Sequence, residues 1–123
     1  MSRRVSIAKS DIPGPYNILD LPEGESVEFI AIGFTKGTAV RQIVEMGRRE
    51  EREGPIMRVF VDPSTPVFGS PYLDVLAGRT VVMLETLFNS VGLPLKVRLT
   101  AHGKEPSKYY SVEYERVGGE RQG

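Results

Sequence analysis

The first half of the chain contains three short runs rich in β-branched and aromatic residues, each bounded by glycine, proline or charge. The run SVEFIAIGFT at 26–35 follows the turn LPEGES and has apolar residues on both faces, which is typical of a central strand. The run TAVRQIVEM at 38–46 follows the tight-turn signal Lys36-Gly37, and PIMRVFVD at 55–62 is the third. The pattern predicts three strands, with the second antiparallel to the first.

A strongly charged stretch, GRREEREG at 47–54, separates the second and third runs. Its six charged residues lie between two glycines, so it is too polar for a core and too short for a helix. We expect an exposed, mobile loop, in which pairing of Glu45 with Arg49 would allow a short helical extension. Its three arginines and three glutamates neutralise one another, so the loop suits contact with a partner protein better than binding of nucleic acid.

Two helical segments are predicted after the third run. Ser70 and Pro71 suit the N-cap and first position of a helix through YLDVLA, with Gly78 as its stop. The next segment, TVVMLETLFNSVG, is ambiguous because TVVML alone would pass as a strand. Four apolar residues nevertheless have the spacing of one helical face, namely Leu84, Leu87, Phe88 and Val91. We therefore predict a helix over about 80–91, ended by Gly92 and Pro94.

The stretch from 95 to 117 predicts a final pair of strands, because apolar and polar residues alternate on both sides of a polar turn. The predicted core side carries Val97, Leu99, Tyr110, Val112 and Tyr114. The predicted solvent side carries Lys96, Arg98, His102, Lys104, Lys108 and Tyr109. From Leu95 to Tyr110 there are four basic residues against Glu105 alone, the strongest local charge bias outside the N-terminus.

Length and composition limit the possible architectures. A chain of 123 residues suits one domain, which we place at 16–117, between a basic flexible arm at 1–15 and a polar, glycine-rich tail at 118–123. No apolar run approaches the roughly 20 residues that span a bilayer, and the N-terminus has no signal-peptide centre. We expect a cytoplasmic protein that does not contact a membrane.

Residue types also limit the chemistry. The chain has no cysteine and a single histidine, which excludes thiol catalysis, thiolate metal sites and a multi-histidine zinc site within one chain. No Ser-His-Asp ordering suggests a triad, and GKEPSK is not a phosphate-binding loop. We expect no catalytic residues, metal or cofactor, and therefore no enzyme. Basic and acidic residues balance at 16 each, so no global field favours a polyanion.

The predicted order is three strands, a helical insertion and two strands, which is the layout of the OB-fold, a partly open five-stranded Greek-key barrel. Three features carry a further resemblance, namely LPEGESVEF before the first strand, Gly92 at the helix end, and KVRLTAHGKEPSKYYSVE after it. They resemble OB-fold single-stranded-DNA-binding proteins of viral and archaeal type over roughly residues 20–117. The resemblance implies binding of single-stranded nucleic acid with little sequence preference, and it alone favours DNA over RNA.

Single-strand binding needs cations along the phosphates and planar groups beneath the bases. The residues expected to supply them are Arg41, Arg58, Phe60, Lys96, Arg98, His102, Lys104, Lys108 and Tyr109. Lysine and arginine on the solvent side of a strand are equally a device that keeps sheets soluble. The alternative hypothesis is a β-barrel adaptor or assembly subunit that contacts protein partners or itself, which the neutral net charge favours.

Overall fold

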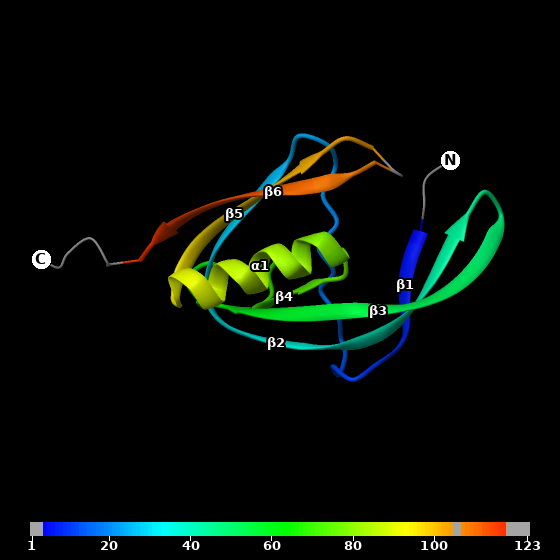
Figure 1. Cartoon of the computed structure of the whole chain (residues 1–123), viewed down its shortest axis with the longest axis horizontal. Helices are drawn as coiled ribbons and strands as arrows, with labels where there is room; N and C mark the ends of the chain where they lie inside the picture. The colour runs from blue at the N-terminus through cyan, green and yellow to red at the C-terminus, as the bar shows by residue number, and fades with distance from the viewer. Residues whose placement is uncertain (1–3, 105–106, 118–123) are drawn as a thin grey trace, which may run out of the picture.

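The computed structural model describes residues 4–104 and 107–117 (Figure 1). The protein is mainly β, as predicted, with six strands and one helix in these ranges. Its elements, in chain order, are β1 (Arg4–Ser10), β2 (Ser26–Glu45), β3 (Arg48–Val61), β4 (Tyr72–Val75), α1 (Gly78–Val91), β5 (Leu95–His102) and β6 (Tyr109–Arg116).

All strands belong to one antiparallel sheet in the order β4-β3-β2-β5-β6, with β1 added beside the distal half of β2. Strands β2 to β5 have the spatial order fourth, first, second, third, which defines a Greek key. No pairing joins β4 to β6 within the part of the chain that the structure describes, so the sheet is open. The predicted five-stranded OB-like barrel is thus not confirmed. Helix α1 instead contacts β3, β4 and β6, and lies across the opening (Figure 1).

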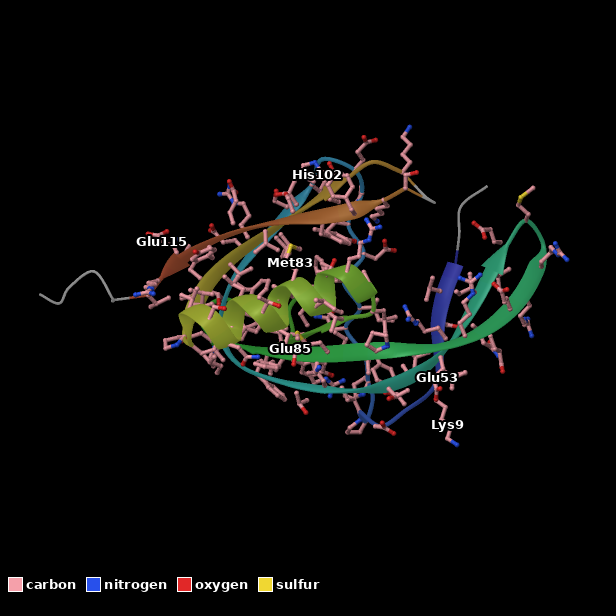
Figure 2. The ribbon with its side chains drawn as sticks, viewed as in Figure 1. Lys9, Glu53, Met83, Glu85, His102 and Glu115 are labelled. Carbon is pink, nitrogen blue, oxygen red and sulfur yellow. The ribbon has the colours of Figure 1, made fainter. Side chains whose placement is uncertain are left out.

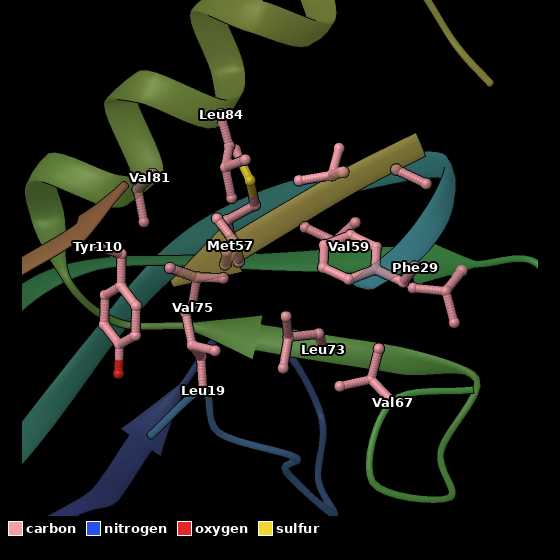
Figure 3. Packing of buried hydrophobic residues seen from close by; sticks show 14 of the residues in the cluster. Leu19, Phe29, Met57, Val59, Val67, Leu73, Val75, Val81, Leu84 and Tyr110 are labelled. Carbon is pink, nitrogen blue, oxygen red and sulfur yellow. The ribbon is translucent and has the colours of Figure 1, made fainter. Parts of the chain in front are cut away.

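The main core lies between the curved sheet and α1 (Figure 3). Leu84 and Val81 on α1 point towards a layer that includes Phe29, Val59 and Leu73 (Figure 3). The helix predicted at 80–91 is confirmed and begins slightly earlier, at Gly78. It forms because its periodic apolar face is buried, and it ends at Gly92, whose φ of 99° suits glycine.

The last two strands are paired as predicted, with Val97, Leu99 and Tyr110 buried and Val112 partly buried. Tyr114 is the exception. It was expected in the core, yet it is 54% exposed. It lies near the open edge of the sheet beside α1, where no further strand among the described residues covers it.

The turn predicted at Lys36-Gly37 is wrong, because β2 continues through these residues to Glu45. Gly37 lies within β2 and allows the chain at Asp11 and Ile12 to pack closely against this strand. A Cβ atom at this position would lie 3.2 Å from Cγ1 of Ile12, which a real contact seldom allows. The glycine therefore gives room for the chain that crosses the strand.

The loop predicted at 47–54 is also wrong, because Arg48 already begins β3 and the turn consists of Met46 and Gly47. Cross-strand pairing continues from the body to Glu45 opposite Arg48, so no helical extension forms there. A charged strand is tolerated here because the exposed hairpin buries little of either face.

The helix predicted from Ser70 and Pro71 is a third error, since Tyr72–Val75 forms β4 against β3. Leu73 and Val75 enter the core, while Asp74 faces the opposite side and pairs with Arg58. Long-range pairing thus overrides the local capping signal.

The N-terminal residues were expected to form a flexible arm, but Arg4–Ser10 is strand β1, paired with β2. The following segment, 11–19, packs on the sheet and then runs beside β4, where Ile18 forms a parallel bridge with Asp74. Ile12 is buried with Ala39, Ile56 and Leu76 in a second small core. The tail predicted at 118–123 lies outside the described residues.

Candidate nucleic-acid interface

The distal part of the β2–β3 hairpin extends away from the body, with β1 along one side (Figure 1). We refer to residues 38–54 together with β1 as the β-arm. Lys108 and Tyr110, at the end of the chain segment that leads from β5 into β6, face the β-arm across a cleft of about 230 Å³. Val5, Ile18, Ile43 and Leu76 contribute apolar surface to this cleft, while Arg41, Lys108 and Asp20 contribute charge.

Arg41 is held at the base of the β-arm. Its Nη1 atom donates a hydrogen bond of 2.7 Å to the carbonyl oxygen of Leu76. The guanidinium lies directly over Gly54, where an added Cβ atom would be only 1.8 Å from Nη2. The absence of a side chain at position 54 therefore allows this placement of the charge.

Lys108 approaches the cleft from the β5–β6 turn. Its Nζ atom lies 2.9 Å from Oδ1 of Asp20 and 5.6 Å from the centre of the Tyr110 ring. Burial by itself lowers the pKa of Lys108. The hydrogen bond to Asp20 and the nearby oxygen of Tyr110 together raise the pKa by more than burial lowers it, so the pKa lies above the ordinary value of 10.5. The lysine is therefore charged at neutral pH.

The stabilising effect of the Lys108 charge is expected to be constant at neutral pH and to disappear in strong alkali. Because folding raises the pKa, this contribution is complete below pH 10.5 and is lost as the pH rises through the higher pKa of the folded protein. Urea unfolding of the wild type and Lys108→Gln at increasing pH measures this effect. The stability difference between them should shrink above about pH 10.5; a difference independent of pH would contradict the assignment.

The outer surface of β5 also carries basic residues, but carboxylates lie on both sides of them. Arg98 is 3.6 Å from Glu28 on β2 and 3.8 Å from Glu113 on β6. Lys96 is 3.9 Å from Glu28 and lies opposite Glu115. These carboxylates come from neighbouring strands, so the positive bias of the sequence between 95 and 110 does not produce a positive surface at these two residues.

An aromatic pair lies at the end of the same outer surface, beside the β5–β6 turn. The rings of His102 and Tyr109 are stacked, with centroids 5.0 Å apart and planes at 20°. Nε2 of His102 is 2.7 Å from Oγ of Ser111, and this contact holds the imidazole in place. Tyr109 is 54% exposed and Lys104 is exposed in the turn, so both are accessible as expected.

Arg58 was expected on an exposed surface, and this expectation is wrong. Only 8% of the residue is exposed, and its guanidinium donates to both carboxylate oxygens of Asp74, at 2.7 and 3.1 Å. The hydrogen bond with Asp74 raises the pKa of Arg58 above its ordinary value. The rings of Tyr16 and Tyr72 lie 5.8 and 4.0 Å from the guanidinium carbon. Arg58 therefore stabilises the fold and is not available to a phosphate.

The segment 11–19 covers this part of the sheet. The backbone N–H of Asn17 donates to Asp74, and its side chain donates to the carbonyl oxygens of Val67 and Tyr72. Pro15 accepts hydrogen bonds from Arg58 and from the hydroxyl group of Tyr72. Sequence reasoning missed this covering, although the apolar positions Ile12 and Leu19 within the segment could have indicated it.

The predicted contact residues thus separate into five places. The cleft is lined by Arg41 and Lys108. The outer surface of β5 and β6 carries Lys96, Arg98, His102 and Tyr109. Arg58 is buried, and Phe60 is 40% exposed opposite Tyr72. Lys104 is exposed and follows the end of β5. Sequence reasoning did not find Asp20 or the apolar lining of the cleft.

Within the ranges 4–104 and 107–117, no group of three or more His, Cys, Asp or Glu side chains could hold a metal ion. No helix in the same ranges has the length and apolar character needed to cross a membrane. Family models, curated proteins and solved structures were compared with the chain, and none of them matches it.

Proposed function

We propose that the protein binds single-stranded nucleic acid in the cleft between the β-arm and the β5–β6 turn, within a partly open OB-like framework. The order of strands and helix supports this framework, because β2, β3 and β4 precede α1 and β5 and β6 follow it. In OB-folds, the loop between the first two barrel strands and the loop between the last two border the oligonucleotide path. The β-arm and the β5–β6 turn correspond to these two loops.

The composition of the cleft is the observation that carries the proposal. Arg41 and Lys108 provide cations from opposite sides, and Ile43, Val5 and Leu76 provide apolar surface between them. Each nucleotide of a single strand carries an exposed base ring and a phosphate. Apolar walls suit the ring and the two cations suit the phosphates, so such a cleft matches a single strand. The exposed ring of Tyr109 on the outer surface, stacked on His102 (labelled in Figure 2), offers a further stacking surface outside the cleft. The expected role is protection of exposed strand without turnover, and DNA is favoured over RNA by the sequence resemblance alone.

The salt dependence of binding tests this function. A fluorescent single-stranded oligonucleotide is titrated with the protein at several salt concentrations, and the anisotropy gives the affinity. Two or three phosphate contacts predict a log-log slope of about −1.4 to −2.1, since each contact on a single strand contributes about −0.7. Absence of binding at low salt would contradict the proposed function.

A pair of charge-matched variants tests the position of the site. Lys108→Gln is expected to weaken oligonucleotide binding about threefold to tenfold and to reduce the salt slope by about 0.7, because one phosphate contact is lost. Lys96→Gln removes the same charge from the outer surface of β5, at a residue that does not line the cleft. It should leave the affinity within about twofold of the wild type. Equal losses in both variants would move the site to the outer surface of β5 and β6.

A second candidate function is that of an adaptor which joins protein chains. The observation favouring it is the internal pairing of the basic residues, since Arg58, Lys108 and Arg98 all lie beside carboxylates. In the described part of the chain, β1 pairs only with β2 and β6 only with β5, which leaves two strand edges for β-augmentation. Light scattering of the protein alone tests self-association, which would appear as a concentration-dependent increase in mass.

A further inference from the structure

The tip of the β-arm carries an exposed apolar side chain in an unfavourable backbone conformation. Met46 and Gly47 form the turn between the paired residues Glu45 and Arg48, and their φ angles are 54° and 78°. A two-residue turn with both φ angles positive strongly favours asparagine, aspartate or glycine. Methionine at the first position therefore opposes folding, and its side chain is 77% exposed, so burial does not compensate.

The residues beside the tip are charged, with Glu45 before the turn and Arg48 and Arg49 after it. Arg48 and Arg49 are exposed and follow the turn directly, and as neighbours on a strand they point to opposite faces. Both also border a hollow that contains Ile43 and Glu45. Since Ile43 lines the proposed binding cleft as well, this hollow continues the cleft towards the tip.

We propose that Met46 is an apolar wedge that inserts between two neighbouring bases of the bound nucleic acid, with Arg48 and Arg49 against the phosphates on either side. The inference rests on the proposed function and adds a second contact between the protein and the nucleic acid, at the tip of the β-arm. Apolar wedges, methionine included, unstack base steps in several DNA-binding proteins. The polarisable thioether also makes favourable contacts with aromatic rings.

The amount of apolar surface favours bases over a membrane. Even a complete myristoyl chain gives only marginal membrane binding, and one methionine buries far less. A base step, in contrast, needs only one side chain of this size between two rings, and it presents a phosphate on each side for a guanidinium. Met46 offers such a side chain, and Arg48 and Arg49, which follow it in the chain, offer the two guanidinium groups.

Fluorescence of 2-aminopurine tests the wedge, because this base brightens when it is unstacked. The full chain is titrated into a single-stranded oligonucleotide that contains one internal 2-aminopurine, and anisotropy of an end label reports binding in parallel. Wild-type protein is expected to increase the 2-aminopurine signal at saturation. Met46→Asn should lose most of this increase and bind about fivefold or more weakly, while its salt slope stays unchanged.

The asparagine variant separates this effect from damage to the fold. Asparagine suits the positive φ angle, so Met46→Asn should unfold at a higher urea concentration than the wild type. Val82→Asn is the matched control, because it removes another exposed apolar residue, 62% accessible, from α1. It should retain the wild-type 2-aminopurine signal, and Met46→Leu should retain most of it.

Three outcomes would overturn the wedge. The wild type would bind without an increase in 2-aminopurine signal, Met46→Asn would keep the full increase and affinity, or Val82→Asn would lose the signal equally. In all three cases oligonucleotide binding itself remains, so the cleft proposal survives. If the wild type fails to bind at low salt, the proposed function fails and the wedge fails with it.

Discussion

Replacing Asp74 with alanine is expected to lower the free energy of unfolding by about 3–5 kcal/mol, the largest effect of any single substitution considered for this protein. The carboxylate is fully buried and accepts hydrogen bonds from the guanidinium of Arg58 and from the backbone N–H of Asn17. Its removal leaves the arginine charge buried without its carboxylate, which is far more costly than the loss of a surface ion pair.

A double variant provides the control for Asp74→Ala. Arg58→Met combined with Asp74→Leu removes both charges and replaces them with apolar groups, which is often close to neutral for a buried pair. We expect it to recover at least half of the stability that Asp74→Ala loses, as measured by urea unfolding. A loss below about 1 kcal/mol for Asp74→Ala would place the pair in the range of an exposed salt bridge and contradict its structural role.

Deletion of residues 1–15 is expected to reduce the free energy of unfolding by at least about 4 kcal/mol. This segment contains β1, the buried side chain of Ile12 and the carbonyl group of Pro15, which accepts from Arg58 and Tyr72. Loss of a buried isoleucine costs about 2–5 kcal/mol, and each lost hydrogen bond about 1 kcal/mol. Typical domains have only about 5–15 kcal/mol in total, so the truncated chain would be barely stable.

A point variant keeps this expectation testable if the truncated chain does not fold. Ile12→Ala in the full chain should cost about 2–5 kcal/mol in urea unfolding. Val5→Ala, at a β1 residue that is 37% exposed, should cost clearly less. If the truncated protein keeps the wild-type stability, residues 1–15 behave as the dispensable arm that the sequence suggests, and the packing of 11–15 on the sheet is unimportant for folding.

The candidate site was only partly predictable from the pattern of residues. Arg41 and Lys108 were identified from sequence because the alternation of residues predicted both on the solvent side of strands. Their opposition across one cleft depends on the pairing of β2 with β5, which joins residues about 70 positions apart. The partners of Lys96 and Arg98 were missed for the same reason, since Glu28 lies on a strand distant in sequence.

The sequence by itself determined the elements whose signal is local and repeated. The apolar face of α1 has a helical period over several turns, and β5 alternates strictly between buried and more exposed residues. Tyr110 and Val112 continue this alternation in the first half of β6, so burial of one face selects one conformation. The predominance of β-structure and the position of the helix directly before the last two strands followed from the same patterns.

Only the tertiary structure decided the elements whose local signals are weak or contradictory. The charged strand 48–54 exists because β2 supplies its hydrogen-bond partners, and β4 exists because β3 does. Arg58 is buried because Asp74 and the segment 11–19 together replace its water, which no short window of sequence can reveal. Backbone hydrogen bonds and charges must be satisfied by some partner, and in this protein the partners come from distant parts of the chain.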